Sequence, residues 1–133
     1  GEVADKHAQT VCSAMEDALL GQLAPMVRIS GVGAFVRAAG DTVFAQLDGD
    51  LQAVFALQQR VVRTLAPLGF RGDGRPFTPH ITLFRNADFR GRGLRARSDD
   101  FFLSTVSVYA SKLGAGFDGG PLYTRLCEIV LSR

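Results

Sequence analysis

The chain contains few of the residues that most directly reveal function. Its 133 residues include two histidines, two cysteines and no tryptophan. Apolar residues make up 47% of the sequence, which is enough for a hydrophobic core, yet no run of 18 apolar residues occurs that could form a membrane-spanning helix. The length predicts one domain over residues 1–133.

The cysteines and histidines do not have the spacing of metal ligands. Cys12 and Cys127 are far apart, and no His, Cys or acidic residues cluster around them. This pattern predicts two free thiols in a reducing compartment, and therefore an intracellular protein, cytoplasmic or nuclear. No metal and no cofactor is expected. The glycine-rich stretch Gly69–Gly74 lacks the Lys-Ser/Thr pair of a nucleotide-binding P-loop.

Positive charge is carried almost entirely by arginine. The chain has 13 arginines and two lysines, and seven of the arginines fall between Arg71 and Arg97, where only Asp73 and Asp88 oppose them. The planar guanidinium group suits phosphate oxygens. The alternative is that this stretch is a solvated loop whose charge keeps the protein soluble. The seven arginines are Arg71, Arg75, Arg85, Arg90, Arg92, Arg95 and Arg97.

Hydrophobic periodicity predicts two amphipathic helices and several short strands. The order of elements is α-β-β-α-β-β-β, with an arginine-rich loop over 86–100. Hairpins and few crossovers favour the α+β class, with a mostly antiparallel sheet and helices packed on one face. The helices are expected over 2–23 and 51–66. The first strand is expected over 26–30, with a break or bulge at Gly31–Gly33 and an extended continuation over 32–37, and the other strands over 42–47, from 79 onward, 101–113 and 122–131.

The most informative segment is Pro79-His80-Ile81-Thr82, at the start of an apolar strand. Side chains alternate between the two faces of a strand, so His80 and Thr82 share one face and Ile81 lies on the other. An imidazole can donate or accept a proton near neutral pH, and a hydroxyl group can hold a phosphate oxygen. The pair therefore predicts half of a site that handles a phosphodiester.

This segment resembles the second His-x-Thr motif of the two-histidine phosphoesterases, a family that includes RNA 2′,3′-cyclic phosphodiesterases and enzymes called 2′-5′ RNA ligases. Arg85 stands five positions after His80, where the family often carries a basic residue. The resemblance implies a pseudo-symmetric architecture of two lobes, each carrying one His-x-Thr/Ser motif.

Further stretches extend the resemblance over roughly residues 2–133. Val108–Leu113 and Gly119–Leu126 resemble the late strands of the family. Phe77, three residues before the histidine, and Gly31–Phe35 resemble the nuclear nucleotide-binding domain of A-kinase anchoring proteins most closely.

The first His-x-Thr motif of the family is absent from these 133 residues. The other histidine, His7, stands in His7-Ala8-Gln9-Thr10, where the spacing is wrong, and it is expected to be a packing residue on a helix. The chain therefore resembles the C-terminal two-thirds of the domain, with an incomplete first lobe. A missing N-terminal segment or a second chain is expected to complete the sheet.

The resemblance implies a metal-independent hydrolase that acts on RNA ends or nucleotides, either on a 2′,3′-cyclic phosphate or on a 2′-5′ phosphodiester. His80 would transfer a proton, as acid or as base, provided that the first histidine comes from outside this chain. Thr82 would hold the phosphate and Arg85 would offset its charge. Phe77 or Tyr109 would stack on a base, and Phe84 would line the groove or fill the core.

Two other interpretations remain open. In the first, the same groove binds a nucleotide such as AMP or CMP, or an RNA, without catalysis, which agrees with the absent histidine. In the second, the domain binds another protein, and His80 is a hydrogen-bonded core residue.

Overall fold

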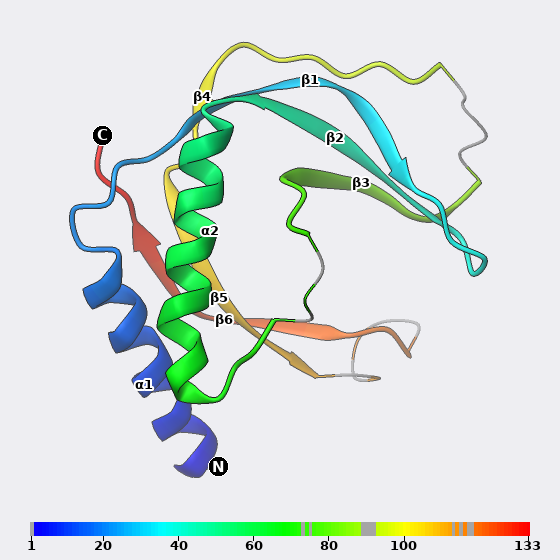
Figure 1. The fold of residues 1–133 in the computed structure, drawn as a ribbon. Coiled ribbons are helices and arrows are strands. Elements are labelled where there is room, and N and C mark those ends of the chain that lie inside the picture. The colour runs from blue at the N-terminus through cyan, green and yellow to red at the C-terminus, as the bar shows by residue number, and fades with distance from the viewer. Residues whose placement is uncertain are drawn as a thin grey trace. The chain divides into compact units, whose positions relative to one another are not determined.

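The computed structural model describes residues 2–72, 74, 76–88, 93–112, 114, 116 and 119–133, without the side chains of residues 2–6 and 86. The chain divides into two compact units that alternate along the sequence (Figure 1). Unit 1 comprises Gly1–Ala24, Gln58–Asp73 and Leu103–Arg133, and unit 2 comprises Pro25–Leu57 and Gly74–Phe102.

Unit 2 is built on a four-stranded antiparallel sheet with the strand order β3-β2-β1-β4. The first half of helix α2 belongs to the same unit. Its elements are β1 (Met26–Phe35), β2 (Asp41–Gly49), the start of α2 (Leu51–Leu65), β3 (His80–Ala87) and β4 (Phe101–Phe102).

Strand β1 continues through Gly31–Gly33, where a break or a bulge was expected, and the structure has a bulge. The pairing of β1 with β2 shifts between Ile29 and Gly31, so that Ser30 forms a bulge and the strand then continues to Phe35. A bulge inserts one residue and bends a strand without ending it. The segments expected over 26–30 and 32–37 are therefore two parts of one bulged strand, and of the two alternatives the bulge is confirmed.

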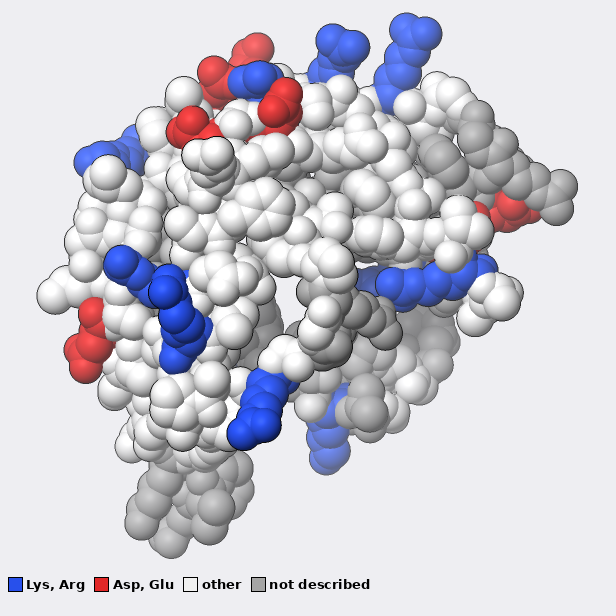
Figure 2. All heavy atoms as spheres, in the orientation of Figure 1, with Lys and Arg blue, Asp and Glu red and all other residues white. Residues whose placement is uncertain are grey.

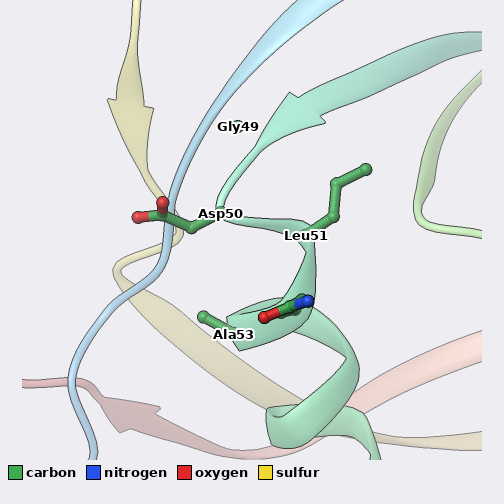
Figure 3. Close-up of a pocket in the computed structure, with 5 residues that line it drawn as sticks. Gly49, Asp50, Leu51 and Ala53 are labelled. Carbon is green, nitrogen blue, oxygen red and sulfur yellow. The ribbon is translucent and has the colours of Figure 1, made fainter.

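The turn from β2 into helix α2 depends on Gly49 (Figure 3). Gly49 has a φ of 110°, and a Cβ atom there would lie 2.7 Å from the carbonyl oxygen of Met26. Only glycine fits this conformation and this close approach. Asp50 follows, and its amide donates to the Met26 carbonyl at 2.9 Å. These contacts join the start of the helix to strand β1.

The core of unit 2 lies between strands β1 and β2 and the start of α2. Val27 is buried in β1, and four consecutive residues are buried in β2. The buried apolar residues are Val27, Val43, Phe44, Ala45, Val54 and Leu57.

Unit 1 combines helix α1 (Glu2–Ala18), the end of α2, the short 3-10 helix η1 (Ala66–Leu68) and a two-stranded antiparallel sheet of β5 (Thr105–Lys112) and β6 (Leu122–Val130). Helix α1 ends at Ala18, five residues before the predicted end, and Gly21 follows with a φ of 75°. Its core residues are Val11, Met15, Leu19, Ala24, Ile129 and Leu131.

The long strand predicted over 101–113 is divided into two strands. Phe101 and Phe102 pair with β1 in unit 2, whereas Thr105 begins β5, which pairs with β6 in unit 1. Between them, the Ser104 carbonyl accepts a hydrogen bond from the Leu131 amide. The apolar pattern is continuous over both strands, so it could not show that the chain leaves one sheet for the other.

The prediction of two free thiols is wrong, because Cys12 on α1 and Cys127 on β6 form a disulfide within unit 1. Their Cα atoms lie 6.2 Å apart although 115 residues separate them in sequence. Packing of the helix on the strand brings them together, which sequence spacing cannot show. Disulfides persist mainly in oxidising compartments, so the intracellular location stays a prediction.

The architecture is α+β with antiparallel sheets, as predicted. The two units correspond to the two lobes that the resemblance implied. None of the helices in the described part of the chain is long and apolar enough to cross a bilayer.

Candidate functional site

His80 is the first residue of strand β3, and its imidazole is exposed. Its Nδ1 atom lies 2.6 Å from the carbonyl oxygen of Thr78. A carbonyl oxygen can only accept, so Nδ1 carries the hydrogen and donates it. The lone pair of the neutral ring is therefore on Nε2. This atom can accept a proton from a bound molecule, or return one when the ring is protonated.

Two phenylalanine rings hold the imidazole of His80 in place. The centroids of Phe35 and Phe44 each lie 5.2 Å from that of His80, both with their planes steeply inclined to it. The two phenylalanine rings also contact each other, with 4.5 Å between their centroids. Edge-to-face contacts of this kind favour one ring orientation, so the imidazole is oriented by packing as well as by its hydrogen bond.

Thr82 shares the face of His80. In the register of β2 with β3, His80 is opposite Gln46 and Thr82 is opposite Phe44. Residues two apart on a strand are separated by about 6–7 Å. This spacing suits one tetrahedral phosphate group, contacted by the imidazole on one side and the hydroxyl on the other. Thr82 is half-buried.

Two glycines of β1 make room for side chains from β2 on this face. A Cβ atom on Gly31 would lie 2.8 Å from Oε1 of Gln46, and one on Gly33 would lie 2.8 Å from Cζ of Phe44. The side chains of Gln46 and Phe44 therefore extend over β1 at the two positions where β1 has no side chain. Glycine at alternate strand positions marks such a close approach.

A hollow of about 320 Å³ adjoins His80 within unit 2. Phe44 and Thr78, which both contact the imidazole, form part of its wall. Polar side chains of Ser30, Gln46 and Asp48 form another part. The hollow therefore combines an aromatic surface with hydrogen-bonding groups, as sites for small organic ligands do.

Two basic residues lie on or next to the strands that surround His80. Arg37 follows the end of β1, and Arg85 is on β3. Arg37 stacks over the Phe35 ring, with its guanidinium carbon 5.8 Å from the ring centroid. This places a positive charge beside the aromatic cluster that holds His80. Arg85 is exposed on β3, beyond a register shift between Val43 and Phe44. Alternation counted from His80 therefore does not fix the face of Arg85.

The three predicted aromatic residues lie in different surroundings. Phe77 contacts Phe55 of helix α2 edge-on, with 5.9 Å between centroids. Simple alternation from His80 and Thr82 would place Phe84 on their face, but the register shift puts Phe84 opposite Val43 instead. Tyr109 is exposed on β5 in unit 1, opposite Arg125. A role for each in binding stays a prediction.

The arginine-rich stretch is only partly described. Arg75, Arg90 and Arg92 lie outside the described residues, whereas Arg95 and Arg97 are exposed in a segment that borders β1. Figure 2 shows Lys and Arg side chains projecting along the edge where the yellow segment before β4 runs in Figure 1.

His7 and the hollow at the start of α2 do not belong to this site. His7 is on helix α1, where its ring lies 4.9 Å from Phe70 in unit 1, in agreement with a packing role. The hollow in Figure 3, about 410 Å³, is lined by the consecutive residues Gly49–Ala53 and holds neither histidine nor arginine. In the described part of the chain, no three His, Cys, Asp or Glu side chains are placed to hold a metal ion.

Sequence reasoning missed several residues that surround His80. Phe44 and Gln46 carry no motif of their own, and their positions follow from strand register. Arg37 lies beyond the end of β1 and is placed by its contact with Phe35. The alternating glycines of Gly31–Phe35 were a usable signal, since they indicate that side chains of a neighbouring strand lie over β1.

Comparison with known proteins agrees with this geometry, although no protein-family model matches the chain. The chain is 30% identical over 121 residues to an RNA 2′,3′-cyclic phosphodiesterase of Geobacillus stearothermophilus, a match that covers 85% of this chain and 38% of that protein. The chain thus spans well under half the length of this relative.

Solved structures show the same fold. E. coli LigT complexed with 3′-AMP superposes with a TM-score of 0.72 at 19% identity, covering 96% of this chain and 70% of that one. TT0787 of Thermus thermophilus gives a TM-score of 0.70, also at 19% identity, covering 92% and 69%. These matches show that the chain has the same fold as LigT and TT0787, and that its sequence is similar to part of an RNA 2′,3′-cyclic phosphodiesterase.

Proposed function

We propose that this chain is part of a phosphodiesterase that opens 2′,3′-cyclic phosphates at RNA ends, or hydrolyses 2′-5′ phosphodiesters, without a metal. The observation that carries the proposal is the exposed His80, whose Nδ1 atom donates to Thr78 at 2.6 Å and leaves Nε2 available. The matched Geobacillus protein is named for cyclic phosphodiesterase activity, and LigT was crystallised with 3′-AMP.

Hydrolysis of a cyclic phosphate needs two proton transfers on opposite sides of phosphorus. A base removes a proton from the attacking water as the new P–O bond forms, and an acid protonates the ribose oxygen as its bond to phosphorus breaks. His80 supplies one of these transfers through Nε2. The second transfer needs a group other than His7, since His7, the other histidine of these residues, packs on Phe70.

The remaining residues bind the substrate in this proposal. The Thr82 hydroxyl donates to a non-bridging phosphate oxygen, and Arg85 and Arg37 offset the charge that develops on phosphorus. The nucleobase lies in the hollow beside Phe44, with Gln46 as its hydrogen-bonding partner, and Phe77 is a further candidate for stacking within unit 2.

The test compares the two histidines of the chain. Hydrolysis of 2′,3′-cyclic AMP in the presence of EDTA is followed by phosphorus NMR for the parent protein, for His80→Asn and for the matched control His7→Asn. We expect His80→Asn to lower turnover about 10²- to 10⁴-fold, with His7→Asn unchanged. Turnover that persists in His80→Asn would contradict the proposal.

A second candidate is a nucleotide- or RNA-binding module without catalysis. The observation in its favour is that His80 is the only histidine on this face of the sheet among these residues. This alternative predicts saturable binding of 3′-AMP that His80→Asn weakens, together with no hydrolysis by the parent protein.

A further inference from the structure

A second hollow in unit 2 contains two arginines and lies next to the hollow beside His80. It has a volume of about 450 Å³ and is lined by Ser30, Gly31 and the segment Leu94–Arg97. Ser30 also lines the hollow beside His80. Ser30, at the β1 bulge, therefore forms part of the wall of both hollows.

The segment that carries the arginines is held against the sheet at a defined position. The Ser98 amide donates to the Ile29 carbonyl at 3.1 Å, and the Ile29 amide donates to Oγ of Ser98 at 2.9 Å. These bonds continue the edge formed by β4, which pairs with Met26 and Val27. The segment thus runs beside β1 as a further extended stretch.

Arg95 and Arg97 are available to bind an anion. Both side chains are exposed, and neither forms an ion pair with a carboxylate in the described part of the chain. Arg28 on the same edge differs, because Asp48 and Asp100 bind it at 3.3 and 3.5 Å. Among the described residues that line the hollow, none is acidic.

Strand register connects this hollow with His80. His80 is opposite Gln46, and Gln46 is opposite Gly31, so the three residues form one row across β3, β2 and β1. With about 4.8 Å between neighbouring strands, the arginine segment is about 14 Å from β3. The single phosphate of a mononucleotide at His80 cannot also occupy the hollow at the arginines.

We infer that the Arg95–Arg97 hollow binds a backbone phosphate of an RNA strand whose terminal phosphate is at His80. This inference rests on the proposed function and adds a second phosphate site, away from His80, for the same RNA strand. Gln46 and the bare backbone at Gly31 lie along the path between the two phosphates. Arginine is well suited to the outer phosphate because its fork forms paired hydrogen bonds with phosphate oxygens.

The experiment measures binding of two probes with the same cyclic end. The probes are 2′,3′-cyclic AMP and an oligoribonucleotide of about five nucleotides that ends in a 2′,3′-cyclic phosphate. Arg95→Gln and Arg97→Gln are compared with Arg63→Gln, which removes one exposed positive charge from α2 in unit 1. Circular dichroism and thermal unfolding confirm that each variant is folded.

We expect the oligonucleotide to bind more tightly than the mononucleotide. Each of the variants Arg95→Gln and Arg97→Gln should weaken oligonucleotide binding about tenfold and lower the salt slope by about one, without affecting the mononucleotide. Arg63→Gln should change neither. Equal affinity for both probes, or equal loss in all three variants, would overturn the inference but leave the proposed function intact.

Two other outcomes would be decisive. If neither probe binds and neither is hydrolysed, the proposed function fails and the inference fails with it. If polyglutamate displaces the oligonucleotide at equal charge concentration and depends on the same arginines, the hollow binds an acidic protein segment, and the RNA assignment is overturned.

Discussion

The two units of the chain differ in how their sheets are used. Unit 2 has four paired strands that carry His80 and two adjoining hollows, one of them lined by arginines. Unit 1 has two strands, and most side chains of β6 are exposed, including those of Leu122 and Tyr123. A disulfide joins its helix α1 to β6.

This difference shows that strand register places the candidate functional side chains in unit 2, whereas a covalent link supports the structure of unit 1. Neighbouring strands position His80, Thr82 and Gln46 in unit 2. A two-stranded sheet is marginal alone, and in unit 1 it is supported by α1 and by the Cys12–Cys127 bond. The following predictions test this contrast.

Removing the disulfide should have the largest effect on stability. The double variant Cys12→Ala/Cys127→Ala removes a disulfide that joins residues 115 positions apart. A disulfide that closes a loop of this size raises the free energy of unfolding by about 4 kcal/mol. Urea unfolding measures the loss, and hydrogen exchange should increase first in β6 and only later in β2. An equal increase of the hydrogen-exchange rate in β6 and β2, or an unchanged midpoint of urea unfolding, would contradict the idea that the disulfide supports unit 1 in particular.

Thr82→Val should affect activity and leave stability almost unchanged. The substitution keeps the shape of the side chain and removes its hydroxyl group, so turnover of 2′,3′-cyclic AMP should fall about 100-fold. Thr82→Ser keeps the hydroxyl and is the matched control. Equal turnover in the two variants would show that this hydroxyl does not contact the phosphate.

Gly33→Ala should disturb the face around His80. The added Cβ atom would lie 2.8 Å from Cζ of Phe44 and 2.9 Å from Nε2 of Gln46, so these side chains must move. Overpacking of this kind costs about 1–3 kcal/mol, measured by urea unfolding, and 3′-AMP binding should weaken. Gly72→Ala is the control, because a Cβ atom at Gly72 meets nothing within 4 Å. Identical behaviour of the two variants would contradict this account of the glycines.

Arg28→Gln should have the smallest effect. Arg28 pairs with Asp48 and Asp100, but all three side chains are about half exposed. Exposed ion pairs contribute at most about 1 kcal/mol, so thermal unfolding should change little. A large loss of stability would show that these charges, and not the strand pairing, hold the edge of the sheet.

The sequence predicted the half of the site that depends on local pattern. Alternation along a strand was enough to place His80 and Thr82 on one face, and turn residues were enough to predict the α+β class. Gln46 and Phe44 could not be assigned, because their positions beside His80 follow from pairing with β3. Beyond Thr82 the register shifts, so simple alternation failed for Phe84.

The disulfide and the division between β4 and β5 were missed for a similar physical reason. Both depend on which elements pack together over long sequence separations, whereas composition and periodicity report only local preferences. Cys12 and Cys127 carry no shared motif, and the apolar pattern from Phe101 to Lys112 is the same whether the residues form one strand or two.

The most direct test of the central claim uses the fact that each unit contains one histidine. The two imidazole signals, from His7 and His80, are followed by proton–nitrogen NMR during titration with 3′-AMP, and His7→Asn identifies which signal is which. We predict that the His80 signal shifts saturably while the His7 signal stays in place. A shift confined to His7, or no shift of His80 at saturating nucleotide, would contradict the assignment of the phosphate site to His80.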